Sequence, residues 1–232
     1  MNLFPTRSLF RLAVCLLAAM PAFGAKKPAA KNPASKGPAP TITVAVDATE
    51  APRKIFHAKL SIPASAGSLT LYYPKWIPGE HGPTGPIQNL TGLRFSAGGQ
   101  ELKWRRDLLD GWTFHVEVPT GVTSVDASLD FVSPAEMDGI YTAGANATDK
   151  MAVISWNTLV LYPDGWTSDD LKFEASLRLP DGWKFGTPLP IASQSGSEIK
   201  FSPASLTTLV DSPVISGQCQ DRTFGRQSAN GA

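Results

Sequence analysis

Short runs in which apolar and polar residues alternate dominate the chain between residues 41 and 210. Residues 41–46 (TITVAV) are rich in β-branched side chains, and residues 55–62 (IFHAKLSI) and 112–118 (WTFHVEV) approach the period of two that is typical of a half-buried strand. Further strands are predicted at 68–73, 89–95, 124–132, 151–155, 158–162, 171–179 and 198–201. Glycine, proline and aspartate separate the runs about every ten residues, which predicts an all-β fold, an antiparallel β-sandwich-like domain.

The segment 203–210 (PASLTTLV) has a helical character instead. Ser202 is positioned to cap a helix, Pro203 suits its first turn, and Ser212-Pro213 prevents its continuation. We therefore expect one short helix near the C-terminal end of the β domain.

Residues 1–24 have the three parts of a secretory signal peptide. Arg7 and Arg11 give a basic start, residues 12–20 are apolar, and Ala22-Phe23-Gly24 supplies the cleavage site. The apolar run is too short to span a bilayer comfortably, so the chain is not expected to be membrane-spanning. We expect a cleaved signal and an exported protein, periplasmic or extracellular.

Residues 25–40 follow as a segment without any large apolar side chain. Such a segment cannot bury enough surface to offset the entropy lost on ordering, so we predict a disordered linker rich in lysine, proline and alanine. Its four lysines would suit an anionic envelope surface, but a solvated linker is the simpler interpretation.

Charge and cysteine content narrow the function classes. Residues 41–232 keep 15 of the 21 lysines and arginines and all 20 acidic residues, a formal net charge of −5. A mildly acidic body without a basic stripe argues against nucleic acid as a partner. Once the signal is removed, Cys219 is the remaining cysteine, so no intrachain disulfide forms and the fold depends on its core.

A tripeptide repeat, Asp-Gly-Trp, occurs at 110–112, 164–166 and 181–183. Asp-Gly is turn chemistry, and the tryptophan that follows is expected at a strand start, covering the edge of the sandwich. An exposed tryptophan also stacks on sugar rings, so a carbohydrate-binding role stays open. Packing at the edge is the favoured interpretation, because aromatic side chains dominate core burial.

The most rigid segment is residues 72–83 (YYPKWIPGEHGP). Its three prolines fix φ, and its two glycines allow backbone angles that other residues avoid. A loop that holds one shape suits either a structural corner or a wall that faces a ligand, and for Glu80 and His81 both roles stay open. The candidates for a substrate cleft or an interface are Trp76, Pro78, Gly79, Glu80 and His81.

Catalytic motifs are missing from the chain. No His-Glu-x-x-His, Cys-x-x-Cys, glycine-rich phosphate loop or Gly-x-Ser-x-Gly elbow occurs. His57 and His115 occupy strand positions and are predicted to be packed or surface residues. Asp126 and Asp130 share one strand face, where solvent contact is favoured over a paired-carboxylate site. We therefore predict no catalytic residue, no metal and no cofactor.

Several strings, taken in order along the chain, carry a family resemblance. They are residues 51–57 (APRKIFH), 60–63 (LSIP), 74–83 (PKWIPGEHGP), 89–93 (NLTGL), 179–184 (LPDGWK), 187–190 (TPLP) and 209–214 (LVDSPV). Together they resemble the N-terminal domain of family 61 metallopeptidases, the glycyl aminopeptidase type of zinc enzyme, over residues 41–218.

The resemblance implies a β domain that precedes a thermolysin-like zinc domain, packs against it and helps to shape its substrate cleft. Enzymes of this type remove N-terminal residues, notably glycine. The sequence departs from the family at His81, where members commonly have tyrosine. It departs again at residues 219–232, a polar, unstructured tail where an apolar strand is expected. A truncated or frameshifted gene product explains that tail, and a stand-alone domain is the other explanation.

The sequence thus predicts the non-catalytic N-terminal domain of an exported, glycyl-aminopeptidase-like metallopeptidase. Its expected partners are a zinc peptidase domain, either in the full-length gene product or in trans, and a peptide substrate. The alternative is a secreted β-sandwich binding module for carbohydrate or for a protein partner.

Overall fold

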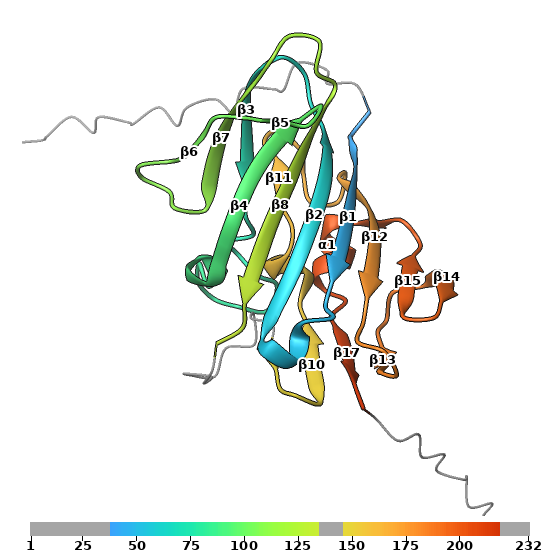
Figure 1. Cartoon of the computed structure of the whole chain (residues 1–232). Helices are drawn as coiled ribbons and strands as arrows, with labels where there is room; N and C mark the ends of the chain where they lie inside the picture. The colour runs from blue at the N-terminus through green and yellow to red at the C-terminus, as the bar shows by residue number, and fades with distance from the viewer. Residues whose placement is uncertain (1–37, 135–145, 219–232) are drawn as a thin grey trace, which may run out of the picture. The chain divides into compact units, whose positions relative to one another are not determined.

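The computed structural model describes residues 38–134 and 146–218 (Figure 1). They belong to one compact unit, residues 35–232. The predicted signal peptide, most of the linker, Cys219 and the tail of residues 219–232 lie outside the described residues.

The largest element is a nine-stranded sheet whose strands run in the order β14-β15-β12-β1-β2-β8-β4-β5, with β16 paired to β12. Its strands are β1 (Thr41–Asp47), β2 (Ile55–Pro63), β4 (Leu90–Ala97), β5 (Gln100–Glu101), β8 (Ser124–Val132), β12 (Lys172–Arg178), β14 (Ile191–Ser195), β15 (Glu198–Phe201) and β16 (Ala204–Ser205). One face of this sheet is apolar and buried, and the other is polar.

Two four-stranded sheets complete the β structure of the described residues, in the orders β13-β17-β10-β9 and β11-β3-β7-β6. Their strands are β3 (Gly67–Tyr72), β6 (Trp104–Arg106), β7 (Thr113–Val118), β9 (Asn146–Ala147), β10 (Met151–Ile154), β11 (Tyr162–Pro163), β13 (Lys184–Gly186) and β17 (Val214–Gly217). Short helical turns connect them: η1 (Ala51–Arg53), η2 (Ile87–Asn89), η3 (Trp156–Thr158) and α1 (Leu206–Val210).

A single hydrophobic core joins the three sheets. The large sheet contributes Phe56, Phe131 and Phe173, and the smaller sheets contribute Phe114 and Ile154, all fully buried. This core explains the alternation in the sequence, because every second residue of β1, β2, β8 and β12 is turned into it. The prediction of an all-β, sandwich-like fold with one short helix is confirmed.

One pair of strands departs from the predicted antiparallel arrangement. β1 runs parallel to β12 (Figure 1), with Thr41 opposite Lys172 and Asp47 opposite Arg178. Periodicity along the chain is the same for both directions, so it cannot distinguish a parallel neighbour from an antiparallel one.

One predicted strand does not form as expected. The apolar run 158–162 is not a strand: η3 occupies its start, residues 159–161 are fully buried, and β11 begins at Tyr162. An unbroken apolar run does not distinguish a strand from a buried turn.

The helix α1 begins at Leu206, and Ser205 caps it instead of Ser202. The Ser205 hydroxyl accepts a hydrogen bond from the backbone N–H of Thr208 at 3.1 Å. The two residues before the helix, β16, pair with Lys172 and Phe173 of β12, so this pairing takes them out of the expected helix. In the described residues, no helix is long and apolar enough to cross a membrane.

Candidate functional site

The predicted rigid loop begins directly after β3, and Tyr73 anchors its start. The Tyr73 ring is fully buried, its backbone N–H donates to the carbonyl oxygen of Trp112 at 2.8 Å, and its hydroxyl donates to the carbonyl oxygen of Thr158 at 3.1 Å. Burial raises the pKa of Tyr73, so the hydroxyl stays protonated and remains a donor. The chain therefore leaves β3 in a fixed direction.

A tight turn shapes the middle of the loop. The backbone N–H of Glu80 donates to the carbonyl oxygen of Ile77 at 3.0 Å, with Pro78 and Gly79 at the two corners. Gly79 has a φ of 81°, which is the left-handed angle that a type II turn requires at its second corner. This is the conformational freedom that the sequence assigned to the glycines of the loop.

Gly85 closes the loop, and sequence reasoning missed it. Its backbone N–H donates to the carbonyl oxygen of Lys75 at 3.0 Å, and its own carbonyl accepts the indole N–H of Trp112 at 2.8 Å. A Cβ atom at this position would overlap the carbonyl oxygen of Pro74, so only glycine fits. The Gly85-Pro86 dipeptide is a turn signal in the sequence, but it lies just beyond the predicted rigid segment of residues 72–83.

Lys75 ties the loop to the neighbouring hairpin between β6 and β7. Its Nζ atom lies 3.0 Å from the Oδ1 atom of Asp110 and 4.8 Å from the centre of the Trp112 ring. Burial disfavours the charged form of Asp110, but the hydrogen bonds from Lys75 and from the backbone of Trp112 outweigh this effect and lower its pKa. Both contacts hold the two loops in one arrangement.

Trp76 and Pro78 line a small groove between the loop, β11 and α1. The groove has a volume of about 220 Å³ and is mainly apolar, with Pro74, Trp76, Pro78, Tyr162, Leu206 and Val210 among its lining residues. The Trp76 side chain is 66% exposed, although it sits on a rigid backbone.

The remaining candidates lie outside the groove lining. Gly79 and His81 are exposed, and Glu80 is half-buried. The structure thus brings together two of the five predicted site residues, Trp76 and Pro78, and does not place Gly79, Glu80 or His81 with them.

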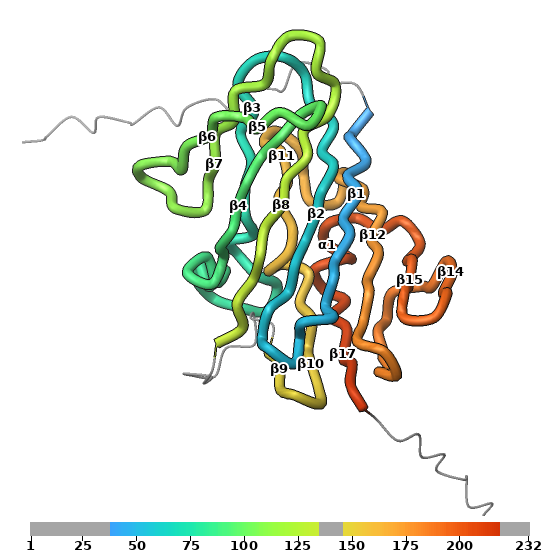
Figure 2. The backbone as a smooth tube through the Cα atoms, in the orientation of Figure 1, coloured from blue at the N-terminus to red at the C-terminus, as the bar shows by residue number. Residues whose placement is uncertain are grey.

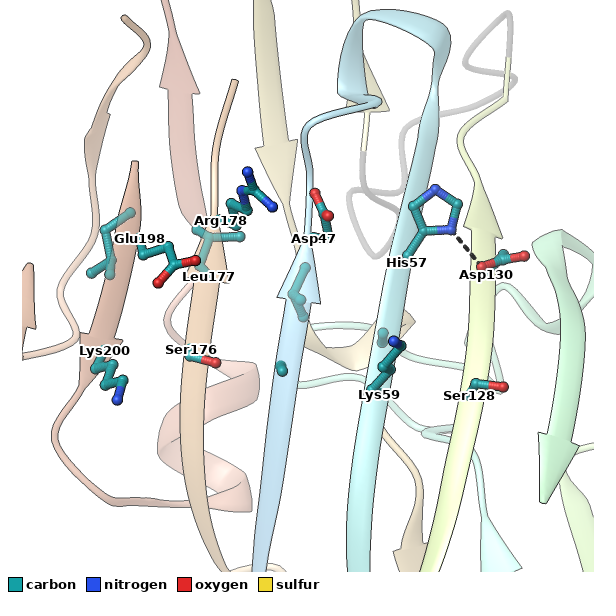
Figure 3. A pocket seen from close by; sticks show the side chains of 14 residues that line it. Asp47, His57, Lys59, Ser128, Asp130, Ser176, Leu177, Arg178, Glu198 and Lys200 are labelled. Atoms are coloured by element: carbon teal, nitrogen blue, oxygen red, sulfur yellow. Dashed lines mark hydrogen bonds and ion pairs between the residues drawn. The ribbon is translucent and has the colours of Figure 1, made fainter. Parts of the chain in front are cut away.

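A second hollow, of about 480 Å³, lies on the polar face of the nine-stranded sheet (Figure 3). Here the Nδ1 atom of His57 is 2.6 Å from the Oδ1 atom of Asp130, and its Nε2 atom is 3.7 Å from the Oε2 atom of Glu50. Burial disfavours the charged imidazole, but the hydrogen bond to Asp130 and the nearby carboxylates raise the pKa of His57 above its usual value.

His57 is part of a row of charges that crosses five strands. In order along the row, the residues are Glu198, Arg178, Asp47, His57 and Asp130, each opposite the next in the strand register. Opposite charges in facing positions stabilise one another, and in this row His57 and Asp130 are close enough to form an ion pair. Sequence analysis did not identify this row, since its members come from strands that are far apart along the chain.

His115 has a comparable role at the β6–β7 hairpin. Its Nε2 atom is 2.9 Å from the Oδ2 atom of Asp107, and its Nδ1 atom is 3.2 Å from the hydroxyl of Thr70. Both strand histidines are therefore half-buried residues with hydrogen-bond partners on neighbouring strands or loops. This outcome confirms the prediction that they are packed or surface residues.

No group of three His, Cys, Asp or Glu side chains that could hold a metal ion occurs in residues 38–134 and 146–218. Asp126 and Asp130 illustrate the point: they share a face of β8, but Asp126 is exposed and Asp130 pairs with His57. The described residues therefore do not fit the zinc ion that the family resemblance implies for a neighbouring domain.

The three tryptophans of the Asp-Gly-Trp repeat pack against the core. Trp112, Trp166 and Trp183 are each partly buried against it. This packing agrees with the favoured interpretation of the repeat. Trp112 and Trp183 precede strands as expected, whereas Trp166 follows β11.

Comparison with solved structures shows which fold this is. The chain is similar to the aminopeptidase N family protein from Idiomarina loihiensis, with 19% identity and a TM-score of 0.66. That similarity covers 81% of this chain but 31% of the other, so this chain spans less than a third of that protein's length. The M1 zinc metallopeptidase from Deinococcus radiodurans matches with 10% identity and a TM-score of 0.47, over 78% of this chain and 42% of that one.

Comparison with curated proteins gave no match. Comparison with protein families gave a match to the Peptidase M61 N-terminal domain, over residues 43–218. The match includes the rigid loop, both histidine pairs and the strands of the large sheet except for the first two residues of β1. Because it extends over most of the chain, this protein belongs to the Peptidase M61 N-terminal domain family.

Proposed function

We propose that this chain acts as the non-catalytic N-terminal domain of an exported, glycyl-aminopeptidase-like metallopeptidase. We propose that it packs against a zinc peptidase domain. That domain is either part of the same gene product or supplied in trans. The observation that carries the proposal is the family match over residues 43–218.

The groove beside the rigid loop supports a role in shaping a cleft. Its volume of about 220 Å³ is below the range of roughly 300–1,000 Å³ that is typical of complete ligand sites. A second surface is therefore needed to enclose a ligand such as a peptide. Trp76 and Pro78 supply one apolar wall, and the zinc domain supplies the other.

Trp76 is the residue on which we expect this contact to depend most. Tryptophan is enriched among the residues that dominate the binding energy of interfaces. Trp76 is 66% exposed, so most of the ring is available for contact. The buried Tyr73 and the Ile77–Glu80 turn fix its backbone in the unbound chain. Preorganisation of this kind reduces the entropy lost on binding.

The test is a binding measurement with the zinc domain of a family 61 peptidase from the same genome. We expect the chain to bind that domain, and we expect Trp76→Ala to weaken the affinity by about tenfold or more. Val132→Ala is the matched control, because Val132 is also an exposed apolar residue but lies on β8, and it should leave the affinity unchanged. Absence of binding, or equal effects of the two substitutions, contradicts the proposal.

A second measurement tests the non-catalytic assignment. The purified chain is stripped of metal and reloaded with zinc, and then incubated with glycyl peptides. We expect no stoichiometric zinc and no release of glycine unless the zinc domain is added. Stoichiometric zinc together with glycine release by the chain alone contradicts the assignment.

A further inference from the structure

The most exposed large apolar side chains in the described residues are Leu108 and Leu109, which are 94% and 99% exposed. They form the tip of the hairpin between β6 and β7, and the backbone trace shows this connection extending away from the sheets (Figure 2). Neither leucine lines the groove beside Trp76 or the hollow around His57. The tip is therefore a projecting apolar feature and not a wall of either site.

The tip has a fixed conformation. The Oδ1 atom of Asp107 accepts the backbone N–H groups of Leu109 at 2.9 Å and Asp110 at 3.0 Å, while its Oδ2 atom pairs with His115 at 2.9 Å. These hydrogen bonds lower the pKa of Asp107 to about 2. Asp110 is paired with Lys75. The Lys75 ammonium group thus offsets the negative charge of Asp110, whereas Asp107 stays ionised and is held by its hydrogen bonds.

The strand that leads to the tip is basic and carries a tryptophan. Lys103, Trp104, Arg105 and Arg106 are all exposed, and no ion pair of the three cations occurs in the part of the chain that the structure describes. The Trp104 ring packs edge-on against Phe114 and remains 36% exposed. In the described residues β6 is an edge strand whose one neighbour is β7, and the Trp104 ring also packs against Phe95 of β4.

We propose that this hairpin, residues 103–109, is a membrane-surface anchor whose two leucines insert into the interface of an anionic lipid bilayer. Exposed leucines at a tip, with two arginines, an indole and a lysine on the strand that leads to it, match the composition of segments that lie in a membrane interface. A protein partner fits less well, because leucine is under-represented among the residues that dominate protein interfaces. A tip of two leucines and three cations gives weak, reversible binding.

The test is cosedimentation with vesicles of 30% phosphatidylglycerol and 70% phosphatidylcholine, compared with pure phosphatidylcholine. The chain is prepared from Ala25 onward, and circular dichroism and thermal melting check its fold. We expect the apparent affinity to be at least fivefold higher for the anionic vesicles and to fall as salt is raised. Leu108→Asp with Leu109→Asp should reduce it about tenfold or more, and Arg105→Glu with Arg106→Glu should remove the preference for anionic lipid.

Ile191→Asp is the matched control, since Ile191 is 50% exposed on β14, and it should bind vesicles like the unmodified chain. Leu108→Ser with Leu109→Ser serves as the second variant if the aspartate pair impairs folding. Binding that survives both leucine variants overturns the proposal, because the linker lysines then account for it. Absence of vesicle binding overturns it as well, and so does a stable dimer that is lost in the leucine variants. The experiment contains no zinc domain, so its outcome is independent of the proposed function.

Discussion

The two histidine–aspartate pairs lie in regions that use their side chains in opposite ways. On the outer face of the large sheet, His57 and Asp130 belong to a row of alternating charges that face one another across the strands. The other region, here called the loop end, consists of the rigid loop after β3 and the hairpin between β6 and β7. There His115 and Asp107 fix the hairpin, whose two leucines are almost fully exposed.

The two regions differ in the kind of side chain that they expose. The outer face carries charged side chains, of which His57 and Asp130 pair with each other, and water solvates the exposed ones. At the loop end, polar groups and backbone hydrogen bonds fix the conformation, and Trp76, Leu108 and Leu109 remain in solvent. Exposed apolar surface of this kind marks interaction sites in folded proteins. For that reason the proposed contact with a zinc domain and the proposed membrane anchor both lie at the loop end.

The largest effect that separates the two regions is expected at Gly85. Gly85→Ala forces a Cβ atom into the carbonyl oxygen of Pro74, so we expect a loss of about 2–3 kcal/mol in the free energy of unfolding. Gly82→Ala is the control within the same loop, because its Cβ would meet only the Thr84 side chain, at 3.9 Å. Urea unfolding of the two variants measures the difference. Equal stabilities would show that the loop is not closed at Gly85.

A smaller effect is expected from the anchor of the loop. Tyr73→Phe removes the buried hydroxyl that donates to Thr158 without opening a cavity, and we expect it to cost about 1–2 kcal/mol. Tyr162→Phe is the control, because no hydrogen bond of the Tyr162 hydroxyl occurs in the described residues. Thermal and urea unfolding measure both variants. A loss in the control as large as in Tyr73→Phe would argue against the anchoring role.

The smallest effect is expected on the outer face, and it depends on pH. Because the folded chain raises the pKa of His57, its pairing stabilises fully below the ordinary value of 6.5 and loses this contribution as pH rises through the folded pKa. Since the side chain is 39% exposed, solvent screening keeps the contribution below about 1 kcal/mol. His57→Gln should therefore destabilise the chain at pH 5.5 and have little effect at pH 8.5.

Urea midpoints of the unmodified chain and of His57→Gln at the two pH values measure this effect. Asp130→Asn should remove the same pH-dependent difference, because it removes the main partner of His57. A destabilisation by His57→Gln that grows with pH would mean that the imidazole is neutral in the folded chain, contrary to the charged row.

Much of the architecture follows from local sequence. The period of two in residues 41–46, 55–62 and 124–132 identifies strands with one buried face, because side chains alternate across a strand whatever its neighbour is. The Pro78-Gly79 pair likewise determines its turn, since proline fixes φ at the first corner and glycine permits the left-handed angle at the second. These are interactions among residues that are adjacent in the chain.

Features that need distant partners were decided by the tertiary structure alone. Two of these features join segments that are far apart in the sequence: the parallel pairing of β1 with β12 and the charge row through His57. The third, the closure of the loop on Gly85, depends on the close approach of backbone atoms, which no pattern of side chains predicts. The exposure of Leu108 and Leu109 belongs to the same class, because an apolar pair is expected in the core until the hairpin is seen to hold it in solvent. The sequence by itself thus determined most of the longer strands, the turn and the family, whereas packing decided the shorter strands such as β6 and which surfaces remain free for a partner.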